Sequence, residues 1–576
     1  MAERLVRFAE RLRRAVSESR LLGQFFCGDG SADSLSVRRR TTHFRIMRLQ
    51  ENSRIRQGTE RLRLALLSTS VGACAACLFA AAAVALGLYF LRGGEDFTDA
   101  AVLLPAAVLL SALPAVGNGS PLSFCLRQGH LTAPFLFGFC GLASDRLGEE
   151  REHGIRRYGA VPAGVAIGVL WSVVPPAAPL LFAAAGFLVW LFAAVPELCA
   201  VALALCFPFL PLLPHPTVLL GGGVLLTLAF FCGKWMSGRR DFRFSAVDRA
   251  ALAFSAAYLF AGGVTGAASA LLAFGGWTVF RSLREHWRNR ALGGLVLSGS
   301  LCACIGLWEY LSGHAVLRWV DMSRFSDIGG RVCATFDNPN ILAVFLLAVY
   351  PVSLCGALRF GHRAGRMLSG AGALLIAGCM IVTWSRGGWL GMIAETALFL
   401  ALYSSRSLAA LFCLPFPVLA AAPYLPHPIL NRFASIGWRT ESSVRYRTEV
   451  WRGILRMTAA HPFGIGTSES VFRRIWQNYA IPGTETVMHA HSLLPQLALE
   501  TGFAGAALGG MFLLCLIRSF RPSGWSVAGI SALGGLLLMG LFDCLWYARG
   551  MIWLIFAVSA LIPAERGMDE KQMECD

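Results

Sequence analysis

One arginine lies where a charge is unexpected, in the polar segment Glu441–Gly502. At about 100° per residue this segment begins as an amphipathic helix. Its polar face carries Arg445, Glu449, Arg452 and Arg456, and its apolar face carries Val444, Val450, Trp451, Ile454, Leu455 and Thr458. Arg447 falls in the middle of the apolar face. A dry, unpaired charge there costs several kcal/mol, so we predict that Arg447 meets a partner or an anionic ligand.

Two histidines, His489 and His491, close the same segment just before an apolar run. Histidines at this spacing can bind a metal, but no clear third ligand is nearby and Glu500 is a weak candidate. A neutral imidazole that acts as a base or hydrogen-bond partner fits better. We therefore predict no metal at this position.

An arginine also precedes the sequence Asn338-Pro339-Asn340. Asn338 can cap a helix, and Pro339 suits its first position. The resulting helix N-terminus favours anions near Arg331. An ordinary capped transmembrane helix with a surface arginine explains this pattern equally well.

Arg386 lies in the sequence Thr-Trp-Ser-Arg-Gly-Gly-Trp at a predicted span end. The two glycines allow the chain to reverse into the next span. Taken alone, this pattern favours an interfacial arginine that extends to the membrane surface between tryptophans.

Two features lie between Arg447 and the histidines. The sequence His461-Pro-Phe-Gly-Ile-Gly466 ends the first helix. A second amphipathic helix follows, and its apolar face is suited to lie on the membrane surface. That face comprises Val471, Phe472, Ile475, Trp476 and Tyr479.

Composition excludes an ordinary soluble protein. The 576 residues are 56% hydrophobic, with a mean hydropathy of +0.58, which is typical of polytopic membrane proteins. A net charge of +17 would suggest nucleic acid as a partner of a soluble chain. Here the arginines cluster between spans, so membrane orientation explains them better and no nucleic-acid partner is predicted.

The apolar runs predict an all-α, polytopic transmembrane helical bundle of about 14–16 spans with a large extracytoplasmic loop. The predicted spans are 64–91, 100–116, 159–174, 178–194, 198–213, 217–233, 248–265, 266–281, 291–311, 339–357, 367–385, 387–404, 407–424, 503–519, 525–542 and 550–563. The predicted divisions are a basic amphipathic arm (1–63), an N-terminal membrane half (64–247), a catalytic membrane half (248–563) with loop 426–502, and a tail (564–576).

The arginine distribution predicts the orientation. The Arg-rich arm is expected on the cytoplasmic face, against the membrane lipids. Both termini are then cytoplasmic, and the segments Leu311–Asn338, Ser385–Gly388 and Pro426–Gly502 face the extracytoplasmic side.

The order of these motifs resembles the O-antigen ligase and polymerase superfamily. An arginine precedes NPN, then come SRGG, R-x-x-x-W…P-F-G-x-G and HAHS…E-x-G, over roughly Ser300–Phe542. The resemblance implies that Arg331, Arg386 and Arg447 hold a pyrophosphate and that His491 is catalytic beside Arg447. We also predict that Asn338, Asn340 and His489 take part in substrate binding. Ser492 replaces the asparagine that commonly follows the catalytic histidine, and this departure concerns the acceptor contacts.

The residues suit this chemistry. Cations stabilise a departing pyrophosphate, and a histidine can accept the proton of an attacking sugar hydroxyl. No glycosidase-type carboxylate pair and no Gly-rich nucleotide loop is present. We predict a bacterial inner-membrane glycosyltransferase without metal or cofactor. Its donor is an undecaprenyl-pyrophosphate-linked oligosaccharide, and its acceptor is a sugar, lipid or protein in cell-envelope polysaccharide assembly.

Other functions remain open. Polymerase and ligase are not separated by the sequence. A flippase or transporter of lipid-linked glycans predicts charges in the middle of spans or discontinuous helices, whereas the charges here lie at span ends and in one loop. A membrane scaffold gives no reason for Arg447 on an apolar face.

Overall fold

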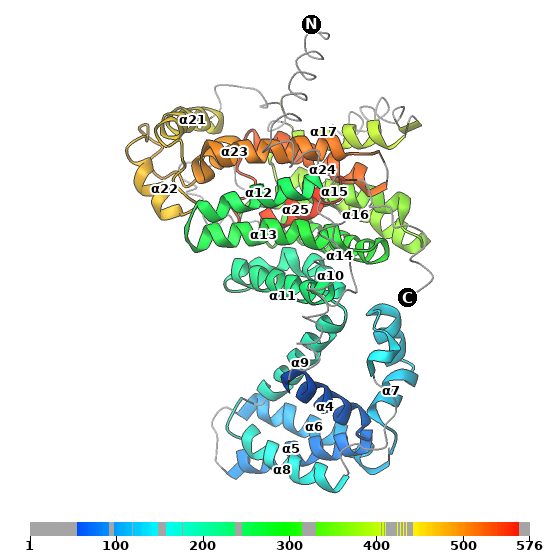
Figure 1. The fold of residues 1–576 in the computed structure, drawn as a ribbon. Coiled ribbons are helices and arrows are strands. Elements are labelled where there is room, and N and C mark those ends of the chain that lie inside the picture. Colours follow the sequence, from blue (N-terminus) through cyan, green and yellow to red (C-terminus); the bar gives the residue numbers. More distant parts are fainter. Residues whose placement is uncertain are drawn as a thin grey trace, which may run out of the picture. The chain divides into compact units, whose positions relative to one another are not determined.

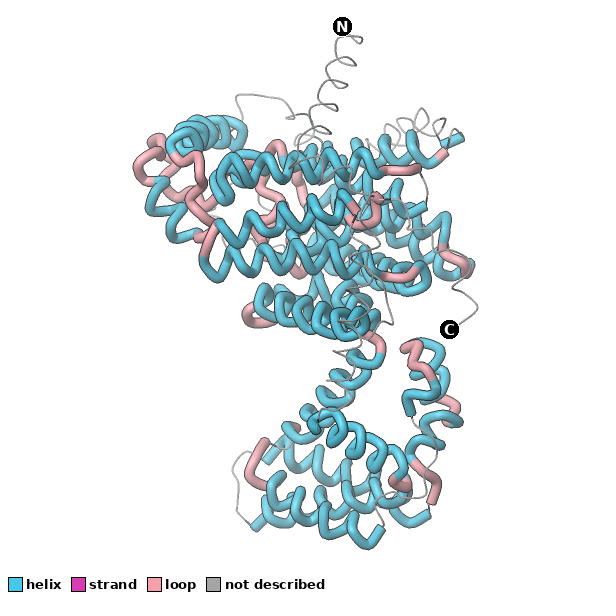
Figure 2. Tube along the Cα trace, in the orientation of Figure 1, coloured by secondary structure: helices cyan, strands magenta, loops and turns pink. Residues whose placement is uncertain are grey.

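The computed structural model describes residues 54–91, 97–117, 119–147, 157–175, 177–236, 245–313, 330–404, 442–522 and 524–563, with isolated residues between 406 and 434. Every regular element in these ranges is a helix (Figures 1 and 2). The predicted all-α fold class is therefore confirmed. The predicted arm 1–63 lies mostly outside the described residues, and the predicted span 407–424 and tail 564–576 lie almost entirely or entirely outside them.

The chain forms two compact units. The smaller contains the described residues up to 198, together with 232–236. Its helices are α4 (Arg54–Ser68), α5 (Val71–Leu91), α6 (Phe97–Gly117), α7 (Leu122–Gln128), η1 (Pro134–Phe139), η2 (Ser144–Leu147), α8 (Arg157–Trp171) and α9 (Ala178–Ala194). Helix α5 packs against α6 and α8. A Cβ atom on Gly164 of α8 would lie 2.3 Å from the Cys77 carbonyl oxygen, so small residues allow this close helix contact.

The larger unit contains residues 199–231 and the described residues from 245 onward. Its helices are most of α10 (Glu197–Cys206), η3 (Phe207–Leu212), most of α11 (Pro216–Met236), α12 (Ala246–Phe260), α13 (Gly263–Ser282), α14 (Glu285–Ser312), α15 (Pro339–Arg359), α16 (Arg363–Val382), α17 (Arg386–Tyr403), α21 (Ser442–Ala460), α22 (Glu469–Trp476), α23 (Leu493–Ser519), α24 (Gly524–Gly540) and α25 (Gly550–Ser559). Helix α15 is the most buried span and packs against α16, α17 and α24. Helices α13, α12 and α23 lie side by side (Figure 1).

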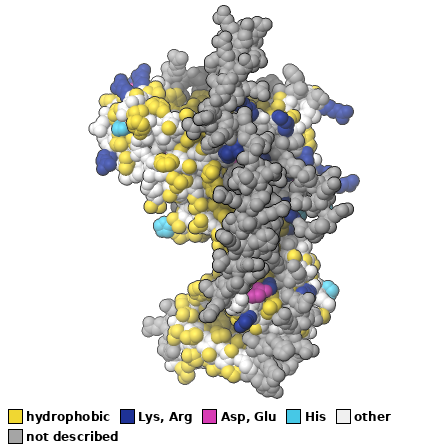
Figure 3. Space-filling model, in the orientation of Figure 1, with side chains coloured by type: hydrophobic (Ala, Val, Ile, Leu, Met, Phe, Trp, Pro, Cys, Tyr) yellow, Lys and Arg dark blue, Asp and Glu magenta, His cyan; other side chains and the backbone are white. Residues whose placement is uncertain are grey.

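Seven helices in the described ranges are long and apolar enough to cross a membrane: α5, α11, α13, α14, α15, α16 and α23. Six shorter apolar segments accompany them. Apolar side chains cover much of the described surface that Figure 3 shows, as suits helices that face lipid. The polytopic membrane architecture is confirmed, while the count of 14–16 spans stays a prediction.

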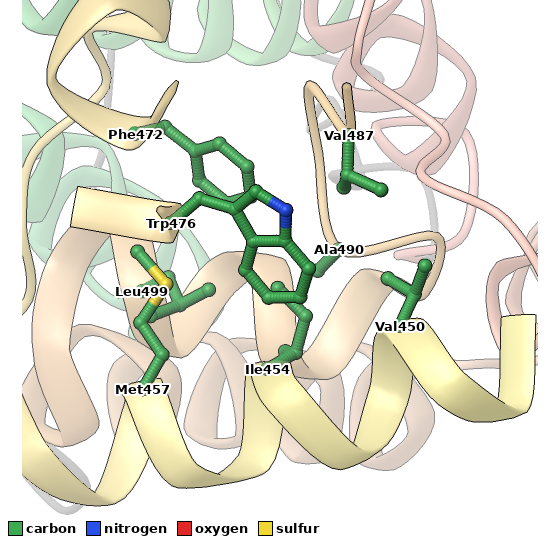
Figure 4. Close-up of a cluster of buried hydrophobic side chains, with 8 residues drawn as sticks. All are labelled: Val450, Ile454, Met457, Phe472, Trp476, Val487, Ala490 and Leu499. Carbon is green, nitrogen blue, oxygen red and sulfur yellow. The ribbon is translucent and has the colours of Figure 1, made fainter. Parts of the chain in front are cut away.

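Helices α21 and α22 form a small core of their own at one end of the larger unit (Figure 1). This α21–α22 core comprises Val450, Ile454, Met457, Phe472, Trp476, Val487, Ala490 and Leu499 (Figure 4). Trp476 is fully buried at its centre, and its indole nitrogen donates to the Thr484 carbonyl at 2.7 Å. The expectation that this face of α22 lies on the membrane is wrong, because α21 and the start of α23 cover Phe472 and Trp476. On α21, Leu455 is 62% exposed rather than part of the apolar face.

The loop His461–Gly466 packs into a break in α23. Gly502 interrupts that helix with φ of 73°, which leaves backbone groups on both sides without helical partners. Ile465 N donates to the Leu499 carbonyl at 2.6 Å, and Phe503 N donates to the Pro462 carbonyl at 2.9 Å. The P-F-G-x-G sequence therefore supplies hydrogen-bond partners to backbone groups at the break and joins α21 to α23.

Candidate active site

The Asp543 side chain contacts residues from three of the sequence motifs. It lies in the turn between α24 and α25 and is buried. Its Oδ2 atom accepts a hydrogen bond from Asn340 Nδ2 at 2.7 Å and lies 3.6 Å from Arg447 Nη2. Its Oδ1 atom lies 3.7 Å from His491 Nδ1. One carboxylate thus joins residues from α15, α21 and the turn before α23.

Arg447 has the partner that its place on α21 requires. Its side chain is 27% exposed and faces Asp543. Arg452, on the same helix, is 63% exposed and pairs with Glu449 at 3.3 Å. The predicted contrast between the two faces of this helix is confirmed at these positions.

Arg331 is buried and holds protein groups. Its Nε donates to the Thr383 carbonyl, and its Nη2 donates to Asn340 Oδ1, both at 2.8 Å. Asn340 therefore bridges Arg331 and Asp543. The preceding turn is fixed by Glu309, whose Oε2 accepts the backbone N–H groups of residues 333 and 334 at 3.0 and 2.8 Å.

The start of α15 is built as its sequence predicts. Asn338 is the N-cap, its side chain accepts from Asn340 N at 2.8 Å, and Pro339 occupies the first helical position. Arg386 is the first residue of α17. The next residue, Gly387, packs close to Met539, whose carbonyl accepts from Asp543 N. The beginnings of α15 and α17 therefore both lie close to the Asp543 turn.

The two histidine rings lie against each other, tilted by 53°, beside this carboxylate. Their ring centroids lie 4.1 Å apart, and the His489 ring also lies 4.6 Å from the Tyr547 ring. His491 N donates to His489 Nδ1 at 3.2 Å. From α21, the Trp451 indole donates to the His491 carbonyl at 3.2 Å. Helix α21 therefore fixes the His491 backbone, and Tyr547 packs against the His489 ring.

Backbone strain gathers around the same group. In the described residues, four non-glycine residues have positive φ, and three of them, Ala334 (51°), Trp384 (54°) and His491 (48°), lie in the motif segments. Such conformations cost about 1–3 kcal/mol each. They persist where surrounding contacts impose them, as the Glu309 and Trp451 hydrogen bonds do here.

A buried hydrogen-bond chain supports the histidines from α23. Gln496 Oε1 accepts from Ala490 N, between the two histidines, and Gln496 Nε2 donates to Glu500 Oε1, each at 2.8 Å. Glu500 also pairs with Arg549 at 2.8 Å. Arg549 reaches the Thr467 carbonyl at 3.0 Å. Glu500, the weak metal-ligand candidate of the sequence, is therefore engaged in this chain.

Comparison with known families decides the classification. Residues 371–510 match the family model described as O-Antigen ligase. This segment, about a quarter of the chain, is similar to the O-antigen ligase family. The resemblance drawn from the motif order is thus confirmed. The matched segment contains Arg386, Arg447 and both histidines, whereas Arg331, Asn340 and Asp543 lie outside it. A search of curated proteins found no match.

Burial and neighbouring charges decide the protonation states at the site. Burial would raise the pKa of Asp543, but the neighbouring His491 and Arg447 outweigh it and hold the pKa well below its usual range. For His489, burial lowers the pKa to about 3, aided by His491 and Arg447 and opposed by Asp543. Near neutral pH the site therefore holds an ionised carboxylate beside a neutral His489 imidazole.

The arrangement also supplies the third metal-ligating group that the sequence lacked. His489, His491 and Asp543 offer ligand atoms that lie within 4.8 Å of one another. Asp543 was missed because it is distant in sequence. The available signal was an acidic residue directly after the apolar run 525–542. That signal does not indicate which other span ends lie next to this residue in the folded protein.

Proposed function

We propose that this chain is a membrane glycosyltransferase that transfers or polymerises oligosaccharide from an undecaprenyl-pyrophosphate donor. The acceptor is a sugar, lipid or protein, and the reaction takes place on the extracytoplasmic face of the bacterial inner membrane. The observation that carries the proposal is the Asp543 carboxylate, which holds a cation, Arg447, and a candidate base, His491, together. The match of residues 371–510 to the O-antigen ligase family supports the same chemistry.

His491 is the proposed base. With its proton on Nδ1, facing Asp543 Oδ1, its Nε2 lone pair is free to accept the proton of the acceptor hydroxyl. The 3.7 Å separation exceeds a hydrogen bond, and such contacts commonly tighten when substrate binds. The hydroxyl oxygen then bonds to the anomeric carbon. The bond from that carbon to pyrophosphate breaks, and the electron pair leaves with the phosphate oxygen.

The arginines stabilise the leaving group in this proposal. Arg447 is partly exposed, so its guanidinium can contact pyrophosphate while it faces Asp543. Arg386 adds charge at the N-terminus of α17. Arg331 fixes Asn340 and, through it, Asp543. Together with Asn338 and His489, these residues form the proposed pyrophosphate- and glycan-binding side.

We also propose that transfer needs no metal or cofactor. Arginine charge can neutralise a departing pyrophosphate, the role that a divalent ion performs in other transferases. The expected result is full transfer in the presence of EDTA. Loss of transfer on chelation, with recovery on adding one metal, would contradict this part of the proposal.

The deciding experiment is incubation with a lipid-pyrophosphate oligosaccharide and candidate acceptors, followed by sizing of the sugar products. A ladder indicates a polymerase, and one shifted acceptor indicates a ligase. His491→Ala should abolish either product while the protein stays folded and inserted. Unchanged donor in every reaction would contradict the proposal.

Transport is the second candidate because two features of the spans suit it. Helix α23 is discontinuous at Gly502, and Glu395 of α17 is buried with neither carboxylate oxygen hydrogen-bonded in the described structure. The same experiment separates the two functions in sealed vesicles. Movement of intact donor across the bilayer without a new glycosidic bond would establish transport instead.

A further inference from the structure

The spacing of His491 and Asp543 is unusual for a hydrogen-bonded pair. His491 Nδ1 is buried and makes no hydrogen bond within the described residues. It lies 3.7 Å from Asp543 Oδ1, which is beyond hydrogen-bond length. Two ligand atoms each about 2.0–2.1 Å from a tetrahedral zinc ion lie about 3.4 Å apart. The gap is therefore close to the spacing that a bound ion would give these two atoms.

We propose that His489, His491 and Asp543 form a Zn²⁺-binding site, and that zinc bound there inhibits the enzyme. The inhibition rests on the proposed function, whereas the binding does not. The three ligand atoms, already within 4.8 Å of one another, need to approach by at most about 1.4 Å to reach zinc geometry. Three protein ligands of this kind leave the fourth position open to water.

The surrounding contacts orient the carboxylate for such an ion. Asn340 and Arg447 both engage Asp543 Oδ2. The Oδ1 atom accepts a hydrogen bond from Cys544 N at 2.8 Å and also faces His491. Carboxylates that bind metals are commonly hydrogen-bonded through neighbouring groups in this way. The Trp451 bond to the His491 carbonyl and the Gln496 bond to Ala490 N fix the backbone that carries both imidazoles. The site is thus formed before any ion arrives.

Zinc at this position opposes the proposed catalysis through the tautomer of His491. A metal on Nδ1 displaces the proton that faces Asp543, and in the neutral imidazole that proton resides on Nε2. The Nε2 lone pair is then no longer available to accept a proton from the acceptor hydroxyl. The ion also occupies Asp543 Oδ1. Zinc therefore blocks the base, and transfer proceeds only when zinc is not bound.

Binding is tested directly with the purified full-length protein. Metal is removed with EDTA, the chelator is washed out, and Zn²⁺ is titrated in competition with a chromophoric chelator. His489→Ala and Asp543→Asn should each weaken binding at this site by at least about tenfold. His461→Ala is the matched control, because this histidine lies on the same segment but contacts Tyr479 instead, and its zinc affinity should equal that of the wild type.

Cysteine thiolates are zinc ligands in general, and this chain has 17 cysteines, so Co²⁺ provides a second readout. A nitrogen and oxygen ligand set gives visible cobalt bands without thiolate charge-transfer absorption. The visible bands should disappear in Asp543→Asn and persist in His461→Ala. Equal zinc affinity in all four proteins, or cobalt bands unaffected by Asp543→Asn, would overturn the site.

Activity provides the remaining evidence. Transfer should persist in EDTA, fall when micromolar Zn²⁺ replaces the chelator, and return when EDTA is restored. Transfer that is lost in EDTA and regained with zinc would make the metal catalytic and overturn the inhibition. If no sugar is transferred under any condition while the variants still differ in zinc affinity, the proposed function fails and the site stands. If sugar is transferred and all variants bind zinc equally, the site fails and the proposed function stands.

Discussion

At the scale of single residues, the environment of a charge decides its role more than its type. Arg447 and Arg452 belong to one helix, yet one faces the buried Asp543 and the other pairs with Glu449 in solvent. An exposed ion pair of the second kind contributes about 0–1 kcal/mol. Arg447, in contrast, lies where an anionic ligand shielded from water can take the place of Asp543 or share its contact with the guanidinium. This difference predicts that replacement by alanine has a large effect on transfer at position 447 and almost none at position 452.

Arg447→Ala should abolish glycan transfer in a protein that remains folded, while Arg452→Ala should change stability by under about 0.5 kcal/mol and leave transfer nearly unchanged. Product sizing and thermal melting of both variants provide the measurement. If Arg447 serves only to neutralise Asp543, Arg447→Ala should lower stability and Arg447→Ala with Asp543→Asn should restore it. A stable Arg447→Ala protein that still transfers sugar would contradict both roles.

His489 should make stability depend on pH. Its pKa is lowered from an ordinary 6.5 to about 3 in the folded protein. Between these values the unfolded chain binds a proton that the folded chain excludes, so stability should fall as pH drops through this window. The melting temperature of the wild type should therefore fall more between about pH 7 and about pH 5 than that of His489→Gln, because the variant lacks this loss. Parallel curves would contradict the lowered pKa of His489.

At the scale of elements, the break in α23 connects the site to the membrane bundle. The loop His461–Gly466 fills the break at Gly502 and satisfies its backbone groups. The first part of α23 carries Gln496 and Glu500, which support the histidines. The ion pair of Glu500 with Arg549 ties this part to the turn that contains Asp543. The geometry of one helix break therefore sets the relation between the histidines and their carboxylate.

Gly502→Ala should destabilise the protein more than Gly483→Ala does. Both glycines have positive φ, 73° and 91°, so alanine is strained at either position, by roughly 1 kcal/mol. A Cβ atom on residue 502 would also lie 2.7 Å from the Phe463 carbonyl carbon, whereas one on residue 483 meets nothing within 4 Å. The difference in melting temperature between the variants measures the contact of the loop with α23. Equal losses would show that this contact contributes nothing to stability.

At the scale of the whole molecule, the apolar helices form the scaffold and the polar segments join their ends. The beginnings of α15 and α17, the end of α24 and the turn before α23 all contribute to one site. These ends can meet only if they lie on the same side of the bilayer. The positive-inside pattern predicts that this side faces away from the cytoplasm.

Single-cysteine labelling with an impermeant reagent, in a cysteine-free background, should therefore modify position 447 from the extracytoplasmic side and position 2 only after the membrane is permeabilised. Positions 386 and 491 should behave like position 447. Labelling of positions 447 and 2 from the same side would contradict the orientation and the location proposed for the reaction.

The sequence alone determined the features that depend on local pattern. Composition indicated a polytopic helical membrane protein, and the helical projection placed Arg447 opposite Arg452. Asn338 and Pro339 predicted the start of α15, which the structure confirms. The order of short motifs indicated the resemblance to the O-antigen ligase family, which residues 371–510 match. Each of these inferences uses only residue type and spacing within a few turns, where backbone geometry fixes which side chains are neighbours.

Only the tertiary structure decided which distant residues meet. It showed that Asp543 joins Arg447, Asn340 and His491, and that α22 packs on α21 rather than on a membrane. Hydropathy could not predict either result. The spans are similarly apolar, so their pattern does not encode which helix ends are adjacent, and an amphipathic face looks the same in sequence whether lipid or protein covers it.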